Sequence, residues 1–346
     1  MHPAPLSGAC DEDPSAVSAR RLDHLQRALG AIWIIDALLQ AQPANFTSGL
    51  AGAIVGNAMG QPHWLQVLLV WSAARFASQP IGANLTLVVL QLALGLGILW
   101  HRTRRATLLA SIPYALAVWV VGEGLGNLES GFAMFPSGAP GAALLVAAAA
   151  LILLPPGTPR VTAPADGAAA SAAGGERFAT ALWASLFFAA AVLQAIPVGT
   201  LGFKLAANLQ MATLGEPPTI AHGDGVVSRF VGGHGALTTA VLIASELAIG
   251  SAALLSGRAR RNLLIAACGA FLVFWAVGEN FGSIASGSAS DIGAMPVYAL
   301  IAASLWPVRV VARRPIVRPA LAPTVTSLPL RFSAARSAYT PHPPSR

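Results

Sequence analysis

Charged side chains are scarce in this chain of 346 residues, and their scarcity limits what the protein can be. Only 10% of the residues are Asp, Glu, Lys or Arg, whereas an ordinary soluble domain carries about 25%. Apolar residues make up 55% of the chain, and its mean hydropathy is +0.64. This composition excludes an ordinary soluble domain and predicts an integral membrane protein in contact with the lipid bilayer.

Cysteine is almost absent, and the two that occur cannot form a thiol relay. Cys10 lies in a polar N-terminal segment, Cys268 lies in an apolar run, and neither belongs to a CxxC pair. Residues 1–19 lack the apolar core of a signal peptide, so we expect the first apolar segment to insert uncleaved. Soft metal ligands occur, but no two have ligand spacing, so we predict no metal site. These ligands are Met59, His63, Met134, Met211, His222, His234 and Met295.

The net charge of +7 comes from arginines that lie just outside apolar runs. Aromatic residues are not interleaved with them and no groove-reading motif is present, so nucleic-acid binding is not expected. Basic clusters beside apolar runs are typical of cytoplasmic flanks, which predicts a multi-pass membrane protein with both termini in the cytoplasm. The clusters are Arg20/Arg21/Arg27, Arg102/Arg104/Arg105, Arg160/Arg177, Arg258/Arg260/Arg261 and Arg309/Arg313/Arg314.

One motif occurs twice. Trp119-Val-Val-Gly-Glu123 is followed 156 positions later by Trp275-Ala-Val-Gly-Glu279. Further pairs lie at offsets of 154 to 156, among them Gln40/Gln194, Gly60/Gly215, Arg75/Arg229 and Arg104/Arg260. A nearly constant offset indicates a duplicated unit of about 130 residues.

The apolar runs predict an all-α protein with eight transmembrane helices, four in each repeat. Because each repeat has an even number of spans, the two repeats are expected to share one orientation, related by an axis along the membrane normal. The expected spans are 25–42, 83–100, 106–122, 139–154, 178–196, 235–256, 262–278 and 294–311. The expected organisation is a polar tail (1–24), a first repeat (25–154), a cytoplasmic linker (155–177), a second repeat (178–311) and a disordered tail (312–346).

A longer, semi-apolar segment separates the first two spans of each repeat. Segment 46–77 contains the amphipathic pattern Trp64-Leu-Gln-Val-Leu-Leu-Val-Trp71, and segment 201–233 is helical in pattern over 201–213, with a loop expected at 216–225. We interpret both segments as external helices at the membrane interface. A re-entrant hairpin is the alternative.

Each repeat thus has a long external segment, a glycine-bearing second span (Leu94-Gly-Leu-Gly97; Ala248-Ile-Gly250), a short basic turn (Thr103-Arg-Arg105; Arg258-Ala-Arg-Arg261) and two further spans. This arrangement resembles the DoxX-like family of small bacterial membrane proteins, here in tandem. The resemblance covers about 110 residues of each half and implies four-helix bundles. Some members of that family are linked to thiosulfate–quinone oxidoreduction and others to oxidative-stress complexes, so the resemblance implies fold more than function.

Glu123 and Glu279 are the first candidate site residues, because each follows an apolar run and is flanked by glycine. Two interpretations are open: a carboxylate that ties down the external loop, or a ligand or proton site at the outer face. Arg75 and Arg229 are placed on the same side, so we expect the ion pairs Arg75–Glu123 and Arg229–Glu279.

Asp36 and Glu246 lie inside predicted spans and break the repeat, since their counterparts are about Ala190 and Gln91. Gln40 and Gln194 lie nearby on the expected helices. A buried carboxyl group in hydrocarbon favours its protonated form, so these four residues are candidates for a proton path or for contact with a quinone carbonyl. The alternative is simple hydrogen bonding between helices.

Three functions compete. A quinone-linked redox subunit, with a soluble or membrane redox partner, requires a cavity near Asp36, Gln40 or Glu246. A small-solute transporter requires a polar cleft between the repeats. A non-catalytic anchor or scaffold requires neither of these features.

Overall fold

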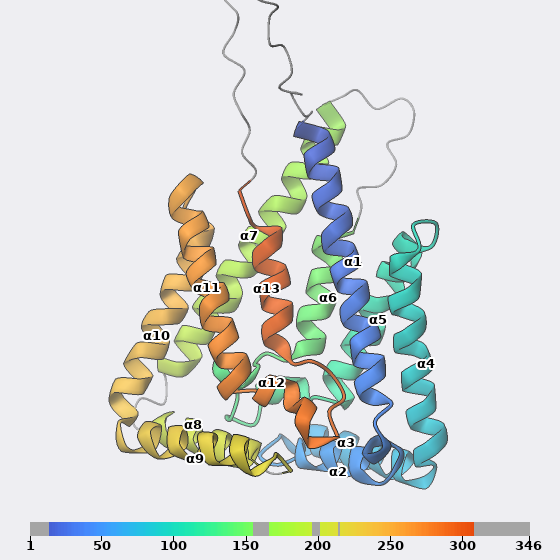
Figure 1. The fold of residues 1–346 in the computed structure, drawn as a ribbon, viewed down its shortest axis with the longest axis vertical. Coiled ribbons are helices and arrows are strands. Elements are labelled where there is room, and N and C mark those ends of the chain that lie inside the picture. Colours follow the sequence, from blue (N-terminus) through green and yellow to red (C-terminus); the bar gives the residue numbers. More distant parts are fainter. Residues whose placement is uncertain (1–13, 155–165, 196–200, 214, 308–346) are drawn as a thin grey trace, which may run out of the picture. The chain divides into compact units, whose positions relative to one another are not determined.

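The computed structural model of the protein describes residues 14–154, 166–195, 201–213 and 215–307 (Figure 1). Within these ranges the protein is all-α, with thirteen α-helices and no strand, as the composition predicted. The longest helices are α1 (Pro14–Gln40), α4 (Pro80–Leu99), α5 (Arg104–Val121), α7 (Asp166–Ala195), α10 (Gly235–Ser251) and α11 (Gly257–Val277). Two shorter apolar helices are α6 (Ala142–Ile152) and α13 (Ala294–Ser304), and α12 (Asn280–Ser283) is a single turn.

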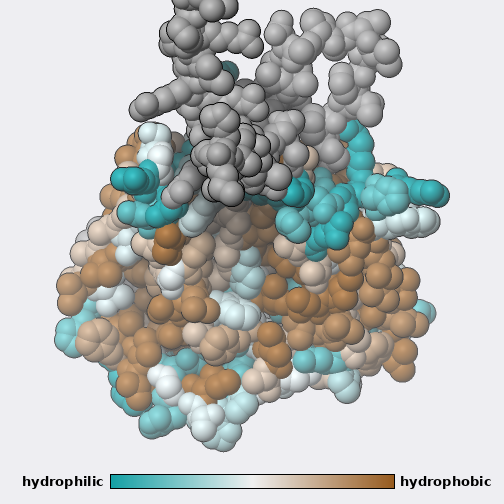
Figure 2. Space-filling model, turned by 45° about the horizontal axis from the view of Figure 1, so that its top comes forward, coloured by the Kyte–Doolittle hydropathy of each residue, from teal (hydrophilic) through white to brown (hydrophobic). Residues whose placement is uncertain are grey.

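Four helical segments are long and apolar enough to cross a membrane. They are Pro80–Leu99, Gly175–Ala195, Gly235–Leu254 and Gly257–Val277. Large apolar side chains are exposed along them, for example Val89 on α4, Val241 on α10 and Leu272 on α11. Figure 2 shows hydrophobic residues covering the middle of one face, with hydrophilic residues at its margins. Such a surface is suited to lipid rather than to water.

The other four expected spans correspond to α1, α5, α6 and α13, which do not meet the same standard of length and hydropathy. Helices α6 and α13 have 11 residues each, which makes each about 16 Å long, against a hydrocarbon thickness of about 30 Å. Both are largely buried, because they pack against each other and against the long helices. Irregular segments precede them and cover their N-terminal ends.

Four helices lie across one end of the long helices (Figure 1). They are α2 (Gly49–Gly56), α3 (His63–Ser78), α8 (Leu201–Ala212) and α9 (Pro218–Gly233). Helix α3 buries Leu65 and Leu69 and exposes Trp64 and Trp71, as its amphipathic pattern predicted. The prediction of a loop at 216–225 is wrong, because α9 begins at Pro218. A proline is well suited to the first turn of a helix.

Two helices extend beyond the expected spans. Helix α1 begins at Pro14, inside the expected polar tail, and α7 begins at Asp166, inside the expected linker. Alanine-rich sequence is a good helix former, which explains the extension of α7 into residues 166–177. The rest of the linker before residue 166 and the predicted disordered tail (312–346) lie outside the described residues.

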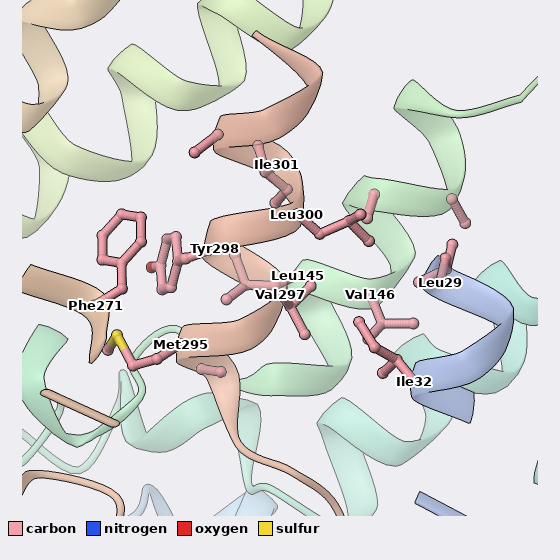
Figure 3. Packing of buried hydrophobic residues seen from close by; sticks show 14 of the residues in the cluster. Leu29, Ile32, Leu145, Val146, Phe271, Met295, Val297, Tyr298, Leu300 and Ile301 are labelled. Carbon is pink, nitrogen blue, oxygen red and sulfur yellow. The ribbon is translucent and has the colours of Figure 1, made fainter. Parts of the chain in front are cut away.

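The main hydrophobic core lies around α13 (Figure 3). On one side of this helix Tyr298 faces Phe271 of α11, with ring centroids 5.5 Å apart. On the other side Val297 and Leu300 face the α6 residue Leu145. Helices from the two halves of the sequence therefore share one core.

Arginines tie the helices together at the end opposite to α2, α3, α8 and α9. Arg104 at the start of α5 contacts Asp23 of α1 at 2.6 Å, and Arg260 of α11 lies 3.5 Å from Glu176 of α7. Arg21 donates to the carbonyl groups of Ala303 and Ser304, which lie at the end of α13. A cation is favourable at a helix C-terminus, where free carbonyl groups accumulate.

Candidate functional site

A cavity of about 430 Å³, which we name the inner cavity, lies among α1, α4, α5, α6 and α2. The helical repeat explains why its polar residues meet, since positions three or four apart share a helix face. Trp33, Asp36 and Gln40 face the cavity from α1, and Gln91 and Tyr114 face it from α4 and α5. Most of the remaining wall is apolar. This volume and lining are those of a typical small-molecule site.

Buried polar atoms without hydrogen-bond partners line the inner cavity. Trp33 is 4% exposed and its Nε1 has no acceptor, while Gln91 is 6% exposed and its Oε1 has no donor. The Tyr114 hydroxyl group is also buried and lies close to the Gln91 side chain. Almost all buried polar groups in proteins are hydrogen-bonded, and each exception calls for a reason. Both a donor and an acceptor are thus available to a ligand.

Asp36 is 5% exposed and is held by the backbone of a distant segment. The N–H of Ile292, in the segment before α13, donates to Asp36 Oδ1 at 3.0 Å. One turn along α1, Gln40 donates to Asn84 Oδ1, and Asn84 Nδ2 donates back to the Gln40 carbonyl group at 3.0 Å. The Gln40 side chain therefore has its hydrogen-bond partner within the protein. Asp36 instead lines the cavity, and its hydrogen bond from Ile292 fixes its position.

A second, more polar cavity of about 450 Å³, which we name the outer hollow, adjoins the first. It lies between the irregular segments 123–141 and 279–294, near α2, and Glu123, Glu279 and Asp291 line it. Glu123 and Asp291 line the inner cavity as well. These two carboxyl groups therefore stand where the cavities meet.

Glu123 and Glu279 each bind the first turn of the helix that follows. Ala143 N–H donates to Glu123 Oε1 at 2.9 Å, and Ala294 N–H donates to Glu279 Oε1 at 3.0 Å. These bonds satisfy backbone donors that have no partner inside a helix. Burial, reinforced by the neighbouring Asp291, raises the pKa of Glu123 and of Glu279 to about 8. Of the two interpretations of these residues, the loop-fixing one matches these bonds directly.

The expected ion pairs do not form. Neither Arg75–Glu123 nor Arg229–Glu279 is within ion-pair distance among the described residues, and both arginines are exposed. The Arg75 guanidinium group lies over the ring of Trp71, 5.3 Å from its centroid. An exposed guanidinium group stays hydrated, and the glutamates already have backbone donors, so pairing would gain little.

Glu246 and Gln194 meet in the second half. Gln194 Nε2 donates to Glu246 Oε1, and both side chains are buried. Gln194 also lines a separate cavity of about 270 Å³ between α6 and α7. The four residues predicted to act together thus form two groups: Asp36 and Gln40 at the inner cavity, and Glu246 and Gln194 away from it.

Several residues of the site were not predicted from the sequence. Trp33 is buried beside Tyr114, with ring centroids 5.5 Å apart. Gln91 and Tyr114 are polar residues inside apolar runs, and this signal could have identified them. Asp291 follows the second copy of the glutamate motif by 12 positions. Among the described residues, no three His, Cys, Asp or Glu side chains gather as metal ligands.

Comparison of the chain with protein-family models, with curated proteins and with solved structures gave no significant match.

Proposed function

We propose that the protein is a quinone-binding subunit in a bacterial plasma membrane, with its ligand held in the inner cavity. The observation that carries the proposal is the pair of unpartnered groups, Trp33 Nε1 and Gln91 Oε1, in a mainly apolar cavity. A quinone ring carries two carbonyl acceptors and an apolar body. The Trp33 N–H and the Tyr114 hydroxyl group can donate to these carbonyl groups, and Gln91 Oε1 can accept from a hydroxyl group of the reduced form, the quinol. Apolar lining residues such as Ile32, Val118 and Val146 can contact the ring and tail.

The role of the chain's own residues is to bind and orient this ligand. A bound quinone supplies two-electron, two-proton redox chemistry, and electrons would come from a soluble or membrane partner. Asp36 is placed by Ile292 at the cavity wall, where it can hold a proton close to the ligand. A non-catalytic anchor would need no cavity with unpaired polar groups, which is why we favour a binding function.

The proposed architecture is two fused DoxX-like four-helix units that cross the membrane eight times in one orientation. The same order of elements in both halves supports it, as do equivalent bonds. The Trp119 and Trp275 indoles donate to the carbonyl groups of Pro140 and Ile292, each at 2.7 Å. The matching ion pairs of Arg104 and Arg260 lie at one end of the helices, which we assign to the cytoplasm.

A small-solute carrier is the second candidate. The outer hollow favours it, because this polar cavity lies between the two halves and is the kind of cleft that a carrier needs. A carrier would take a polar solute at Glu279 and Asp291, whereas a quinone-binding subunit would take its ligand at Gln91.

The test is binding of decylubiquinone to the purified protein in detergent, measured by calorimetry. Replacing Gln91 by Leu should weaken binding of the reduced form, decylubiquinol, about tenfold, because its hydroxyl group loses one hydrogen bond of about 1.4 kcal/mol to Gln91 Oε1. Ala117→Trp should abolish binding, since Ala117 lines the cavity and is exposed, so the larger ring can enter the cavity without disturbing the core. Gln210→Leu, the same change at an exposed position of α8, is the matched control.

Two outcomes would contradict the proposal. One is wild-type protein that neither binds decylubiquinone nor yields a quinone in its lipid extract. The other is binding that Gln91→Leu and Ala117→Trp leave at the level of Gln210→Leu. Binding of a polar solute lost in Asp291→Asn, but not in Gln91→Leu, would support the carrier instead.

A further inference from the structure

Four carboxyl groups line the two adjoining cavities, from the outer hollow to the inner cavity. Glu279 lines the outer hollow, Asp291 and Glu123 line both cavities, and Asp36 lines the inner cavity. The file combines residues from both halves of the chain, since Glu279 and Asp291 follow α11 whereas Asp36 and Glu123 belong to the first half. We name this set the carboxyl file.

No basic side chain neutralises the carboxyl file among the described residues that line the two cavities. The nearby basic groups on this side are engaged elsewhere: Arg75 lies over Trp71, and Lys204 donates to the Gly131 carbonyl group at 2.8 Å. Four carboxyl groups so close together cannot all be ionised without mutual repulsion, so protons must be shared among them.

Backbone N–H groups fix the position of each member, and Glu123 also keeps one carboxyl oxygen without a partner. Glu123 Oε1 accepts from Ala143, and its Oε2 is buried without a partner. Asp291 Oδ1 accepts from the Gly293 N–H at 2.8 Å and its Oδ2 from the Ser290 hydroxyl group at 3.0 Å, while both oxygens of Glu279 accept from the first turn of α13. The same short segment positions Asp36 through Ile292. One backbone segment, 291–293, therefore aligns the file.

The outer hollow has the size and polarity to hold several water molecules, since one water needs a polar site of about 30 Å³. Ser137, Ser283, Ser288 and Asn127 are among its lining residues. Chains of water and carboxyl groups are the usual means by which membrane proteins carry protons. The inner cavity beyond Glu123 is mainly apolar, so Asp36 depends on the file for contact with water.

We propose that the carboxyl file is a proton path that connects the outer face of the protein to Asp36 in the inner cavity. This deepens the proposed function, because it states from which side of the membrane the quinone cavity exchanges protons. Glu123 and Asp291 connect the two parts of the path, since both line the two cavities, and Glu123 Oε2 has no other partner. The pKa of about 8 for Glu123 and Glu279, raised by burial, suits groups that take up and release protons near neutral pH.

The surroundings of Asp36 identify the groups that control its protonation. Helix α4 presents Gln91 and α5 presents Tyr114, both neutral, while α2 and α6 present only uncharged residues. The segment before α13 presents Asp291, and the segment after α5 presents Glu123. The charges that face Asp36 among the described cavity residues are therefore all acidic, and the file is its route to exchangeable protons.

The test is hydrogen–deuterium exchange of carboxyl protons in the purified protein without added quinone. Infrared spectroscopy monitors the exchange. The carbonyl band of protonated Asp36 is identified as the band that Asp36→Asn removes. After transfer to D2O, Glu123→Gln combined with Asp291→Asn should slow the isotopic shift of this band at least tenfold. Glu129→Gln, an exposed carboxylate on the same side, should leave the rate unchanged.

Glu246 supplies an internal control, because it is buried against Gln194 and lies outside both cavities. Its band, identified by Glu246→Gln, should exchange at the same rate in the double variant and in wild type, which also shows that the variant is folded. The proposal is overturned if Asp36→Asn removes no carboxyl band between about pH 5 and 8, or if the Asp36 band exchanges equally fast in the double variant. Because quinone is absent, failure of this test is distinct from failure of quinone binding.

Discussion

At the scale of single residues, Glu123 and Glu279 have a structural role, because they accept hydrogen bonds from backbone N–H groups. A helix N-terminus carries partial positive charge and unpaired N–H groups, which stabilise a carboxylate at the first turn. Each glutamate follows one helix and accepts from the first turn of the next. The matching arginine–glutamate spacing in the sequence suggested ion pairs instead. Spacing alone could not identify the donors, because they lie in the first turns of α6 and α13, whose placement beside the glutamates depends on tertiary packing.

These glutamates give the protein a pH-dependent stability. Their pKa is raised by burial to about 8 in the folded protein, against 4.5 for an ordinary Glu. The folded state therefore holds protons that the unfolded state releases between these values, so the free energy of unfolding should be highest below about pH 4.5 and fall as the pH rises to about 8. Thermal unfolding in detergent across this range should show the decline.

The variant Glu123→Gln/Glu279→Gln isolates this effect, because Gln keeps an acceptor for the backbone N–H but does not ionise. We expect its unfolding temperature to vary less than half as much with pH over the same range. Glu129→Gln should keep the wild-type slope, since this side chain is exposed. An equal slope in wild type and in the double variant would show that the two carboxyl groups do not control stability.

The residues of the site differ in how far the sequence could predict them. Asp36 and Gln40 could be predicted, because a carboxyl and an amide one turn apart in an apolar run mark a polar helix face. Trp33 lies one turn earlier on the same face, but tryptophan is also the usual residue of membrane interfaces. Its role at the inner cavity depends on how α1 packs on α4 and α5, which no local pattern contains.

At the scale of elements, the two short helices α6 and α13 depend on glycine at their starts. Gly141 and Gly293 have φ values of 113° and 87°, and a Cβ atom on either would collide with the carboxyl group of Glu123 or Glu279. Only glycine adopts such a backbone without strain and leaves room for the carboxylate. The glycine thus permits both the turn and the contact that fixes the glutamate.

Replacing Gly293 by Ala should therefore destabilise the protein by about 3 kcal/mol or more, from the clash together with backbone strain. Gly287→Ala is the matched control. Gly287 also has a positive φ (75°), but a Cβ atom there would meet nothing within 4 Å, so its cost should be only about 1 kcal/mol of backbone strain. The measurement is thermal unfolding of both variants in detergent. Equal destabilisation would mean that contact with Glu279 contributes nothing.

The elements themselves were predictable where hydropathy alone determines them. Helices α4, α10 and α11 begin and end within five residues of the expected spans, because uninterrupted apolar runs have no alternative to helix in lipid. Helix α9 was missed because Pro, Gly and Asp usually indicate loops, although packing on α8 overrides that tendency here. The shortness of α6 and α13 was also missed, since hydropathy does not distinguish a buried irregular segment from a helix.

At the scale of the whole molecule, the two halves of the chain differ at positions that line the inner cavity. At the repeat offset, Trp33 and Asp36 correspond to Phe187 and Ala190, and Tyr114 corresponds to Ala270. Phe187 is 1% exposed and belongs to an aromatic cluster with Phe135, Phe271 and Tyr298. Aromatic packing thus occupies in the second half the region where the first half has polar groups. This asymmetry is what a duplicated protein would show if one copy binds the ligand and the other stabilises the fold.

The proposed architecture places both halves the same way up, and labelling of single cysteines in intact cells tests it. Replacing Cys10 and Cys268 by serine gives a background without cysteine, because the chain has no others. His63→Cys on α3 and His222→Cys on α9 should both react with a membrane-impermeant maleimide, since both positions are exposed at the proposed outer end. Arg102→Cys and Arg258→Cys, in the corresponding basic turns, should react only after the cells are opened.

An inverted duplication would instead place His63 and His222 on opposite sides, so labelling of only one of them in intact cells would refute the parallel arrangement. It would also divide the carboxyl file, because Glu123 and Glu279 could then not face one aqueous compartment.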